Sequence, residues 1–111
     1  MKIVITTPYV STNRLYTTAR NGRRIKTRAA SEAKEAIAWE AKAQYMSEPK
    51  TGALKVRIDL FHDDKRRRDL DNIKGLIDAL TGVLWEDDSQ IVELTIKKHT
   101  VVEYPRVEIT I

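Results

Sequence analysis

The stretch from Ala53 to Phe61 constrains the fold of this chain more than any other, because apolar and charged residues alternate along it. One side of the alternation holds Leu54, Val56, Ile58 and Leu60, and the other holds Lys55, Arg57 and Asp59. A period of two is that of an extended strand whose successive side chains point to opposite faces. The stretch therefore predicts a strand with one buried face, which another layer of structure must cover.

Two segments with a helical period can supply that layer. The first runs from about Ala30 to Met46, with Ser31 as the expected N-cap and an apolar face that repeats every four residues, namely Ala33, Ile37, Ala41 and Tyr45. The second runs from about Asn72 to Val83, and its apolar residues follow the i, i+3, i+4, i+7 spacing, namely Ile73, Leu76, Ile77 and Leu80. Both segments predict helices that pack on a sheet.

Three more strands complete the expected layout: Lys2–Thr7, about Gln90–Thr100 and about Arg106–Ile111. Residues 9–28 read as a long polar and basic connection that turns at Gly22. The predicted order is β-α-β-α-β-β, an α+β fold with two helices packed on a mixed sheet. With 111 residues, we expect a single small domain over residues 1–111.

Composition excludes several classes of protein. The chain has no Cys, so it has no disulfide framework, thiol nucleophile or thiolate zinc site. Its two His residues are too few for a His-rich metal site. Its longest apolar run, Ala36 to Trp39, is far shorter than the ~20 residues of a membrane helix, and the N-terminus lacks the apolar core of a signal peptide. We therefore expect a cytoplasmic protein without a membrane partner.

Basic residues dominate the first 30 positions, which contain no Asp or Glu. The seven are Lys2, Arg14, Arg20, Arg23, Arg24, Lys26 and Arg28. A basic arm on a mildly acidic body indicates a polyanionic partner such as DNA. Arg66, Arg67 and Arg68 fit phosphate contacts or balance the charge of neighbouring acids, and Tyr16 either stacks on a base or anchors a loop.

Two acidic pairs flank the second helix. Asp69 and Asp71 precede it at spacing i, i+2, and Asp87-Asp88 lie in the turn before the next strand. Taken alone, the first pair is an acidic helix start and the second a solvated turn. Together, Asp69, Asp71 and Asp88 can converge on a hard cation, Mg²⁺ or Mn²⁺. Such a site activates water for phosphodiester hydrolysis.

Lys74 lies on the polar side of the second helix, three residues after Asp71 and four before Asp78. It can stabilise negative charge that develops on a phosphate. An i, i+4 surface pair with Asp78 explains its presence equally well.

These motifs together resemble the RusA-type Holliday junction resolvases. The resemblance is carried by RRRDLDNIKGLIDALTGVLWEDDSQIVELTIKK, Arg66 to Lys98, and by the Ser-x-Asn-x-x-Tyr pattern of residues 11–16. It implies a small homodimeric, metal-dependent endonuclease, common on prophages, that cuts four-way DNA junctions. By motif position, Asp69, Asp71 and Asp88 are the implied catalytic metal ligands and Lys74 is the implied catalytic lysine. Supporting or DNA-contact positions are Asn13, Asn72, Asp87 and Gln90.

One departure from the family pattern concerns the lysine. Only Ile73 separates Asn72 from Lys74, where the family usually has two residues. One deleted residue rotates a helix by about 100°. A junction-binding protein that retains the fold without cleaving is therefore the alternative function. In either case, the two-fold symmetry of a four-way junction suits a homodimer.

Overall fold

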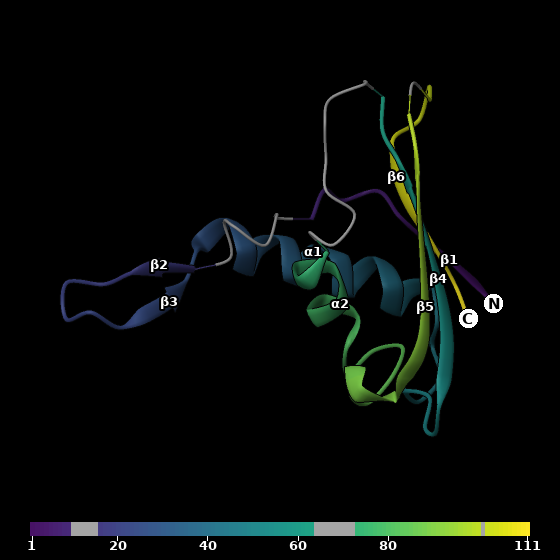
Figure 1. Cartoon of the computed structure of the whole chain (residues 1–111), viewed down its shortest axis with the longest axis horizontal. Helices are drawn as coiled ribbons and strands as arrows, with labels where there is room; N and C mark the ends of the chain where they lie inside the picture. The colour runs from purple at the N-terminus through teal and green to yellow at the C-terminus, as the bar shows by residue number, and fades with distance from the viewer. Residues whose placement is uncertain (10–15, 64–72, 101) are drawn as a thin grey trace.

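The computed structural model describes residues 1–9, 16–63, 73–100 and 102–111. Its elements follow the order β1 (Lys2–Ile5), β2 (Tyr16–Thr18), β3 (Arg24–Lys26), α1 (Arg28–Gln44), β4 (Leu54–Phe61), α2 (Lys74–Leu80), the 3₁₀ turn η2 (Asp88–Gln90), β5 (Ile91–His99) and β6 (Arg106–Thr110). Both helices lie on the same side of the larger sheet, and the β2–β3 hairpin projects away from it (Figure 1). The predicted α+β fold is confirmed.

The larger sheet has the strand order β1-β6-β4-β5. β6 is antiparallel to both β1 and β4, whereas β5 is parallel to β4. A parallel neighbour requires a crossover, and α2 lies within the connection between β4 and β5. The sheet is therefore mixed, as the sequence predicts.

The core lies between this sheet and the helices. The side chains predicted for the buried face of β4 are at most 8% exposed. They pack with Ile3 and Ile5 of β1, with Ile37 and Ala41 of α1, and with Leu76 and Leu80 of α2. Trp85 is fully buried in the same cluster, whereas Trp39 on α1 is 75% exposed. The opposite face of the sheet carries mostly charged side chains, which include the ion pairs Arg57–Asp59 and Arg106–Glu108.

Helix boundaries differ from the predicted ones for local reasons. The N-cap of α1 is Thr27 and not Ser31, because the Thr27 hydroxyl accepts a hydrogen bond from the Ala30 amide at 3.2 Å. The described part of α2 is shorter than predicted and ends at Leu80. Gly82 follows with φ of +89°, a left-handed conformation that turns the chain out of the helix.

The β2–β3 hairpin is an element that the sequence analysis missed. Its turn contains Asn21 and Gly22; the Asn21 side chain accepts from the Arg23 amide at 3.0 Å, and Gly22 has φ of +82°. Asn-Gly is a strong hairpin signal, and β-branched residues flank it here. The hairpin signal therefore lies within residues 9–28, whose composition indicates only a long polar and basic connection that turns at Gly22.

Within the part of the chain that the structure describes, neither helix has the length and apolarity that a bilayer crossing requires.

Candidate active site

Asp88 lies on a short structured turn rather than in a loose loop. It is the first residue of η2, and Asp87 caps that turn by accepting a hydrogen bond from the Ser89 amide at 3.1 Å. The Gln90 side chain completes a capping box, since its Oε1 accepts from the Asp87 amide at 2.9 Å. The Asp88 carboxyl is exposed on this turn, where a ligand can reach it from solvent.

Gln90 also ties the turn to a distant loop. Its Nε2 donates to the carbonyl oxygens of Lys50 and Gly52 at 2.8 and 2.9 Å. The Lys50 amide in turn donates to the carbonyl of Leu84 at 2.9 Å. These bonds join segments about 40 residues apart, so the backbone on both sides of Asp88 is fixed. Gln90, a supporting position by resemblance, thus has a physical role in holding the turn.

The buried Trp85 fixes the same turn from the core side. Its Nε1 donates to Thr81 Oγ1 at 3.0 Å, and that hydroxyl donates to the Ile77 carbonyl at 2.9 Å. The chain from the end of α2 to Asp88 is therefore anchored by one large buried side chain. A rigid support of this kind is what a ligand-binding carboxylate requires.

Negative charge is concentrated around Asp88. A hydrogen bond with Asp87 is the main factor that raises the pKa of Asp88, followed by partial desolvation and repulsion from Asp87 and Asp78. The pKa of Asp87 is lowered, first by the hydrogen bond from the Ser89 amide and then by that with Asp88. Asp78, on α2, is therefore close enough to add to the field at Asp88. Residue spacing along the chain indicates Asp78 only as a possible partner of Lys74.

Lys74 begins α2 and is exposed. The described residues include no ion pair between Lys74 and Asp78, so the surface-pair explanation of this lysine is not realised here. Ile73, the residue before it, is buried in the core and fixes where the helix starts. Lys74 is therefore placed at the start of α2 with its side chain open to solvent.

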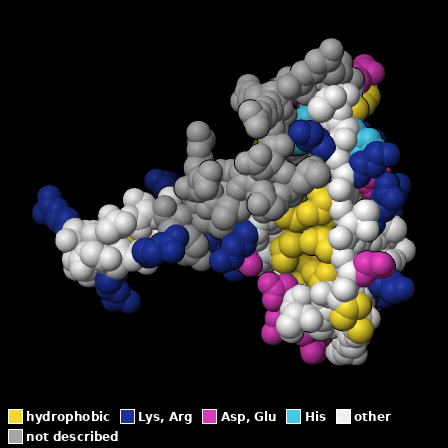
Figure 2. Space-filling model, in the orientation of Figure 1, with side chains coloured by type: hydrophobic (Ala, Val, Ile, Leu, Met, Phe, Trp, Pro, Cys, Tyr) yellow, Lys and Arg dark blue, Asp and Glu magenta, His cyan; other side chains and the backbone are white. Residues whose placement is uncertain are grey.

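A basic residue of the β2–β3 hairpin lies close to an acidic residue of α2. Lys26 of β3 is close to both Lys34 of α1 and Asp78 of α2. Partial burial, followed by repulsion from Lys34, lowers the pKa of Lys26, while Asp78 acts in the opposite direction. Figure 2 shows Lys and Arg side chains along the hairpin and Asp and Glu side chains gathered at the lower end of the same face. Arg20, Arg23 and Arg24 are exposed on the hairpin.

Several predicted site residues lie outside the described residues. They are Asn13, Arg14, Arg66, Arg67, Arg68, Asp69, Asp71 and Asn72, together with the side chain of Tyr16. The described part of the chain holds no group of three or more carboxylates or histidines arranged for a metal ion. What it does hold fits a hard cation: exposed carboxylate oxygens on a fixed turn, in a field of like charge that a cation would relieve.

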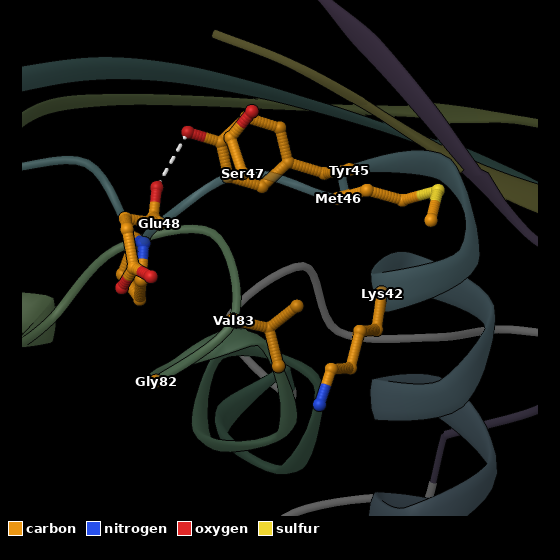
Figure 3. A pocket seen from close by; sticks show the side chains of 8 residues that line it. Lys42, Tyr45, Met46, Ser47, Glu48, Gly82 and Val83 are labelled. Carbon is orange, nitrogen blue, oxygen red and sulfur yellow. Dashed lines mark hydrogen bonds between the residues drawn. The ribbon is translucent and has the colours of Figure 1, made fainter.

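One surface hollow lies apart from these residues. It has a volume of about 420 Å³ and lies between the end of α1 and the loop after α2. Figure 3 shows Lys42 on one side and Gly82 and Val83 on the other, with the Tyr45 hydroxyl donating to the Glu48 carbonyl at 2.7 Å. None of the predicted site residues lines this hollow, so we do not assign the active site to it.

Comparison with known proteins identifies the family to which this chain belongs. The family model of endodeoxyribonuclease RusA matches residues 6–111. The crossover junction endodeoxyribonucleases RusA of Escherichia coli strain K12 and of Enterobacteria phage 82 are each 45% identical to this chain over 60 residues, which is 52% of this chain and 50% of the relative. The corresponding protein of Escherichia coli O139:H28 is 40% identical over the same length. The chain thus matches about half the length of these curated relatives. With the family model matching nearly every residue, the chain belongs to the RusA family of endodeoxyribonucleases.

Proposed function

We propose that this protein is a metal-dependent endodeoxyribonuclease that resolves four-way DNA junctions by paired, symmetric nicks, in recombination or repair within the cytoplasm. The observation that carries the proposal is the fixed, exposed Asp88 carboxyl in a chain that belongs to the RusA family. The matched relatives are named for crossover junctions, and one of them comes from a phage, which supports the DNA substrate and a prophage origin.

In this proposal the acidic side chains hold one or two divalent cations. Asp88 supplies a ligand from the η2 turn, and Asp69 and Asp71 supply the others. When bound, Mg²⁺ or Mn²⁺ contributes Lewis-acid activation of the phosphate and of a water molecule. The contribution of this chain is to fix the carboxylate, since Gln90 holds the turn on which Asp88 lies.

The cationic side chains act on the DNA. Lys74 is exposed at the start of α2, where its ammonium can stabilise negative charge on the phosphate. The exposed arginines of the hairpin neutralise phosphates farther along the duplex arms, together with Asn13, Arg14, Tyr16, Lys26 and the three arginines at 66–68. A homodimer presents two such surfaces and two sites to a substrate that itself has two-fold symmetry.

A junction-binding protein without turnover is the second candidate. It is favoured by one observation, the single residue between Asn72 and Lys74, because this Ile73 is buried and sets the start of α2. A helix start fixed in this way gives Lys74 little freedom to recover the direction of its family counterpart.

Cleavage of a labelled synthetic four-way junction, with and without Mg²⁺, separates the two candidates. We expect symmetric nicks from the parent protein only with Mg²⁺. Asp88→Asn and Asp71→Asn should each reduce the cleavage rate by about 100-fold or more while junction binding persists, because the amide keeps the shape of the side chain and removes its charge. Glu103→Gln is a matched control at an exposed position before β6, away from η2, and should cleave like the parent.

Three outcomes of the assay differ in meaning. Tight binding by the parent protein without cleavage at any Mg²⁺ or Mn²⁺ concentration would establish the second candidate. Full cleavage by Asp88→Asn would remove Asp88 from the site. Failure to shift the junction at all would refute both functions.

A further inference from the structure

Two lysines meet at the base of the β2–β3 hairpin. Lys26 is the last residue of β3, and Lys34 is near the start of α1. Their side chains approach closely enough for a hydrogen-bond contact, so that two positive charges lie side by side. Figure 2 shows Lys and Arg side chains at this end of the hairpin, beside an acidic side chain. We refer to Lys26 and Lys34 as the lysine pair.

Lys34 lies on the side of α1 that is otherwise apolar. It follows the buried Ala30 by four residues and precedes the buried Ile37 by three, and residues at these spacings share one face of a helix. The fully buried Ala41 continues the same face. Figure 1 shows that the first turns of α1 extend toward the hairpin, whereas its last turns lie beside the sheet. An amphipathic helix ordinarily has an apolar residue at such a position, so packing does not explain Lys34.

Lys26 is held in place by the backbone on both sides. Its own backbone pairs with that of Tyr16 across the hairpin, and the next residue, Thr27, is the N-cap of α1. The Lys26 side chain is half-buried, whereas lysines are ordinarily exposed unless they are paired. Both this burial and the charge of Lys34 lower the pKa of Lys26. An anion between two ammonium groups relieves the cost of placing them together.

The described acidic side chains do not neutralise the lysine pair. Asp78 of α2 attracts Lys26, but within the described ranges neither lysine forms an ion pair with Asp78 or with another acid. Glu32, two residues before Lys34, is already paired with Arg28 at 2.9 Å. The lysine pair therefore retains positive charge that an external anion can meet.

We propose that the lysine pair binds one backbone phosphate of a DNA strand, with one ammonium group on each of its two non-bridging oxygens. A phosphodiester carries a single negative charge shared between those two oxygens, so it matches two separate point-like donors. Lysine binds phosphate as a compact charge on a flexible stem rather than as a planar fork. The bound phosphate replaces the repulsion between the two ammonium groups with attraction. The site adds Lys34 to the DNA surface, a residue that neither the motifs nor the family resemblance indicates.

The position of the lysine pair gives this phosphate a specific role, and here the inference rests on the proposed function. Asp78 lies near both Lys26 and Asp88, so the pair is on the same side of the molecule as the acidic turn. The phosphate held by the pair is therefore the innermost of those that the hairpin contacts, on the approach to Asp88. Because the fold fixes both ends of this path, the pair determines which phosphate of the strand reaches Asp88.

Methylphosphonate substitution tests the contact through binding alone, without metal. Each phosphate near the branch point of a synthetic four-way junction is replaced in turn by a neutral methylphosphonate, and affinity is measured by fluorescence anisotropy. We expect several replacements to weaken binding by the parent protein, one of which reports the lysine pair. The double variant Lys26→Ala/Lys34→Ala should bind the unmodified junction about tenfold more weakly. It should show no further loss at that one phosphate and should retain the parent's losses at the others.

Matched variants separate this contact from the effect of net charge. Lys42→Ala/Lys55→Ala also removes two lysines, at exposed positions in the last turn of α1 and on β4, and should bind like the parent. Lys34→Arg keeps the positive charge and should retain most of the affinity, whereas Lys34→Ala should not. Far-UV circular dichroism reports folding, and the exposed Lys34 allows the single variant Lys34→Ala to replace a double variant that does not fold.

Two results would overturn the inference. One is a double variant that shows every loss of the parent in the methylphosphonate series, and the other is a control variant that weakens binding as much as the double variant does. Neither result depends on cleavage. If the phosphate contact is present and the parent protein never cuts, the nuclease is refuted and the lysine pair keeps its role in binding. If the parent cuts and the double variant binds like the parent, the reverse holds.

Discussion

Replacement of Glu40 by Gln should destabilise the fold through one identifiable contact. Glu40 is on α1, and its carboxylate accepts hydrogen bonds from the segment after β1. Oε2 accepts from the amide and hydroxyl of Thr6, both at 2.9 Å, and Oε1 accepts from the amide of Thr7 at 2.7 Å and from its hydroxyl. Four donors on one carboxylate fasten the first strand to the first helix.

The expected loss follows from what Gln can still do. Its single carbonyl oxygen can replace one carboxylate oxygen and keep the bonds to one threonine. Its NH₂ group then faces the amide of the other threonine, donor against donor, so one charge-assisted backbone hydrogen bond is lost. Such a bond is worth about 1.5–3 kcal/mol, and partial exposure lets water replace some of it. We expect Glu40→Gln to lower the free energy of unfolding by about 2 kcal/mol at pH 7.

The loss should depend on pH in a defined direction. Burial acts to raise the pKa of Glu40, but the hydrogen bonds from Thr7 and Thr6 outweigh it and the net pKa is lowered. A lowered folded-state pKa means that the carboxylate stabilises the fold fully above the ordinary Glu value of about 4.3. This stabilisation is lost as the pH falls through the folded-state value, so the difference between parent and Gln variant should shrink in acid.

Urea unfolding followed by tryptophan fluorescence measures both quantities, because the fully buried Trp85 becomes exposed on unfolding. Glu35→Gln is the matched control, an exposed residue of the same helix that bonds to no described residue. It should change stability by less than about 0.5 kcal/mol. If Glu40→Gln matched this control at pH 7, or if its loss stayed constant down to pH 3, the reasoning would be refuted.

Three further predictions concern the turn, the core and the DNA surface. Trp85→Ala should lower the free energy of unfolding, measured in urea, by about 3–5 kcal/mol, because it empties a fully buried site and removes the hydrogen bond to the Thr81 hydroxyl. A loss below about 1 kcal/mol would contradict the anchoring role of Trp85. Gly82→Ala should cost about 1–2 kcal/mol in thermal unfolding, because an L side chain is strained at φ of +89° although the space beside it is open; an unchanged Tm would argue against this conformation. Replacement of both Arg20 and Arg23 by Ala should weaken the salt dependence of binding to a four-way junction, measured by fluorescence anisotropy. The slope of the logarithm of the binding constant against the logarithm of the salt concentration should fall in magnitude by about 2. An unchanged slope would exclude both arginines from phosphate contacts.

Elements of the fold that depend on local period could be predicted from the sequence. The alternation from Leu54 to Phe61 gave β4, and its buried face is the predicted one. The four-residue repeat gave α1, although not its first turn, because Thr27 competes with Ser31 for the cap and the choice depends on where the chain enters the helix. The hairpin was missed because an Asn-Gly turn in a polar segment has no buried face to mark its strands.

Some features of the candidate site could likewise be predicted from the sequence, whereas others could not. The acidic turn at Asp87-Asp88 was visible because turn residues and metal-ligand residues are both recognised by type. Two other features of the site could not be seen in the sequence. These are the hydrogen bonds from Gln90 to Lys50 and Gly52, and the approach of Asp78 to Asp88. Each of these depends on how α2 and two loops pack, and the spacing of residues along the chain carries no record of it.

By itself, the sequence determined the strand and helix periods, the basic first 30 residues and the chemical types at the site, since these are properties of neighbouring residues. Only the tertiary structure decided that Trp85 is core and Trp39 surface, that Glu40 holds the end of β1, and that β5 is left at the edge of the sheet. The physical reason is that burial and strand order come from contacts between distant segments. Such contacts exist only once the helices have covered one face of the sheet and left the other open.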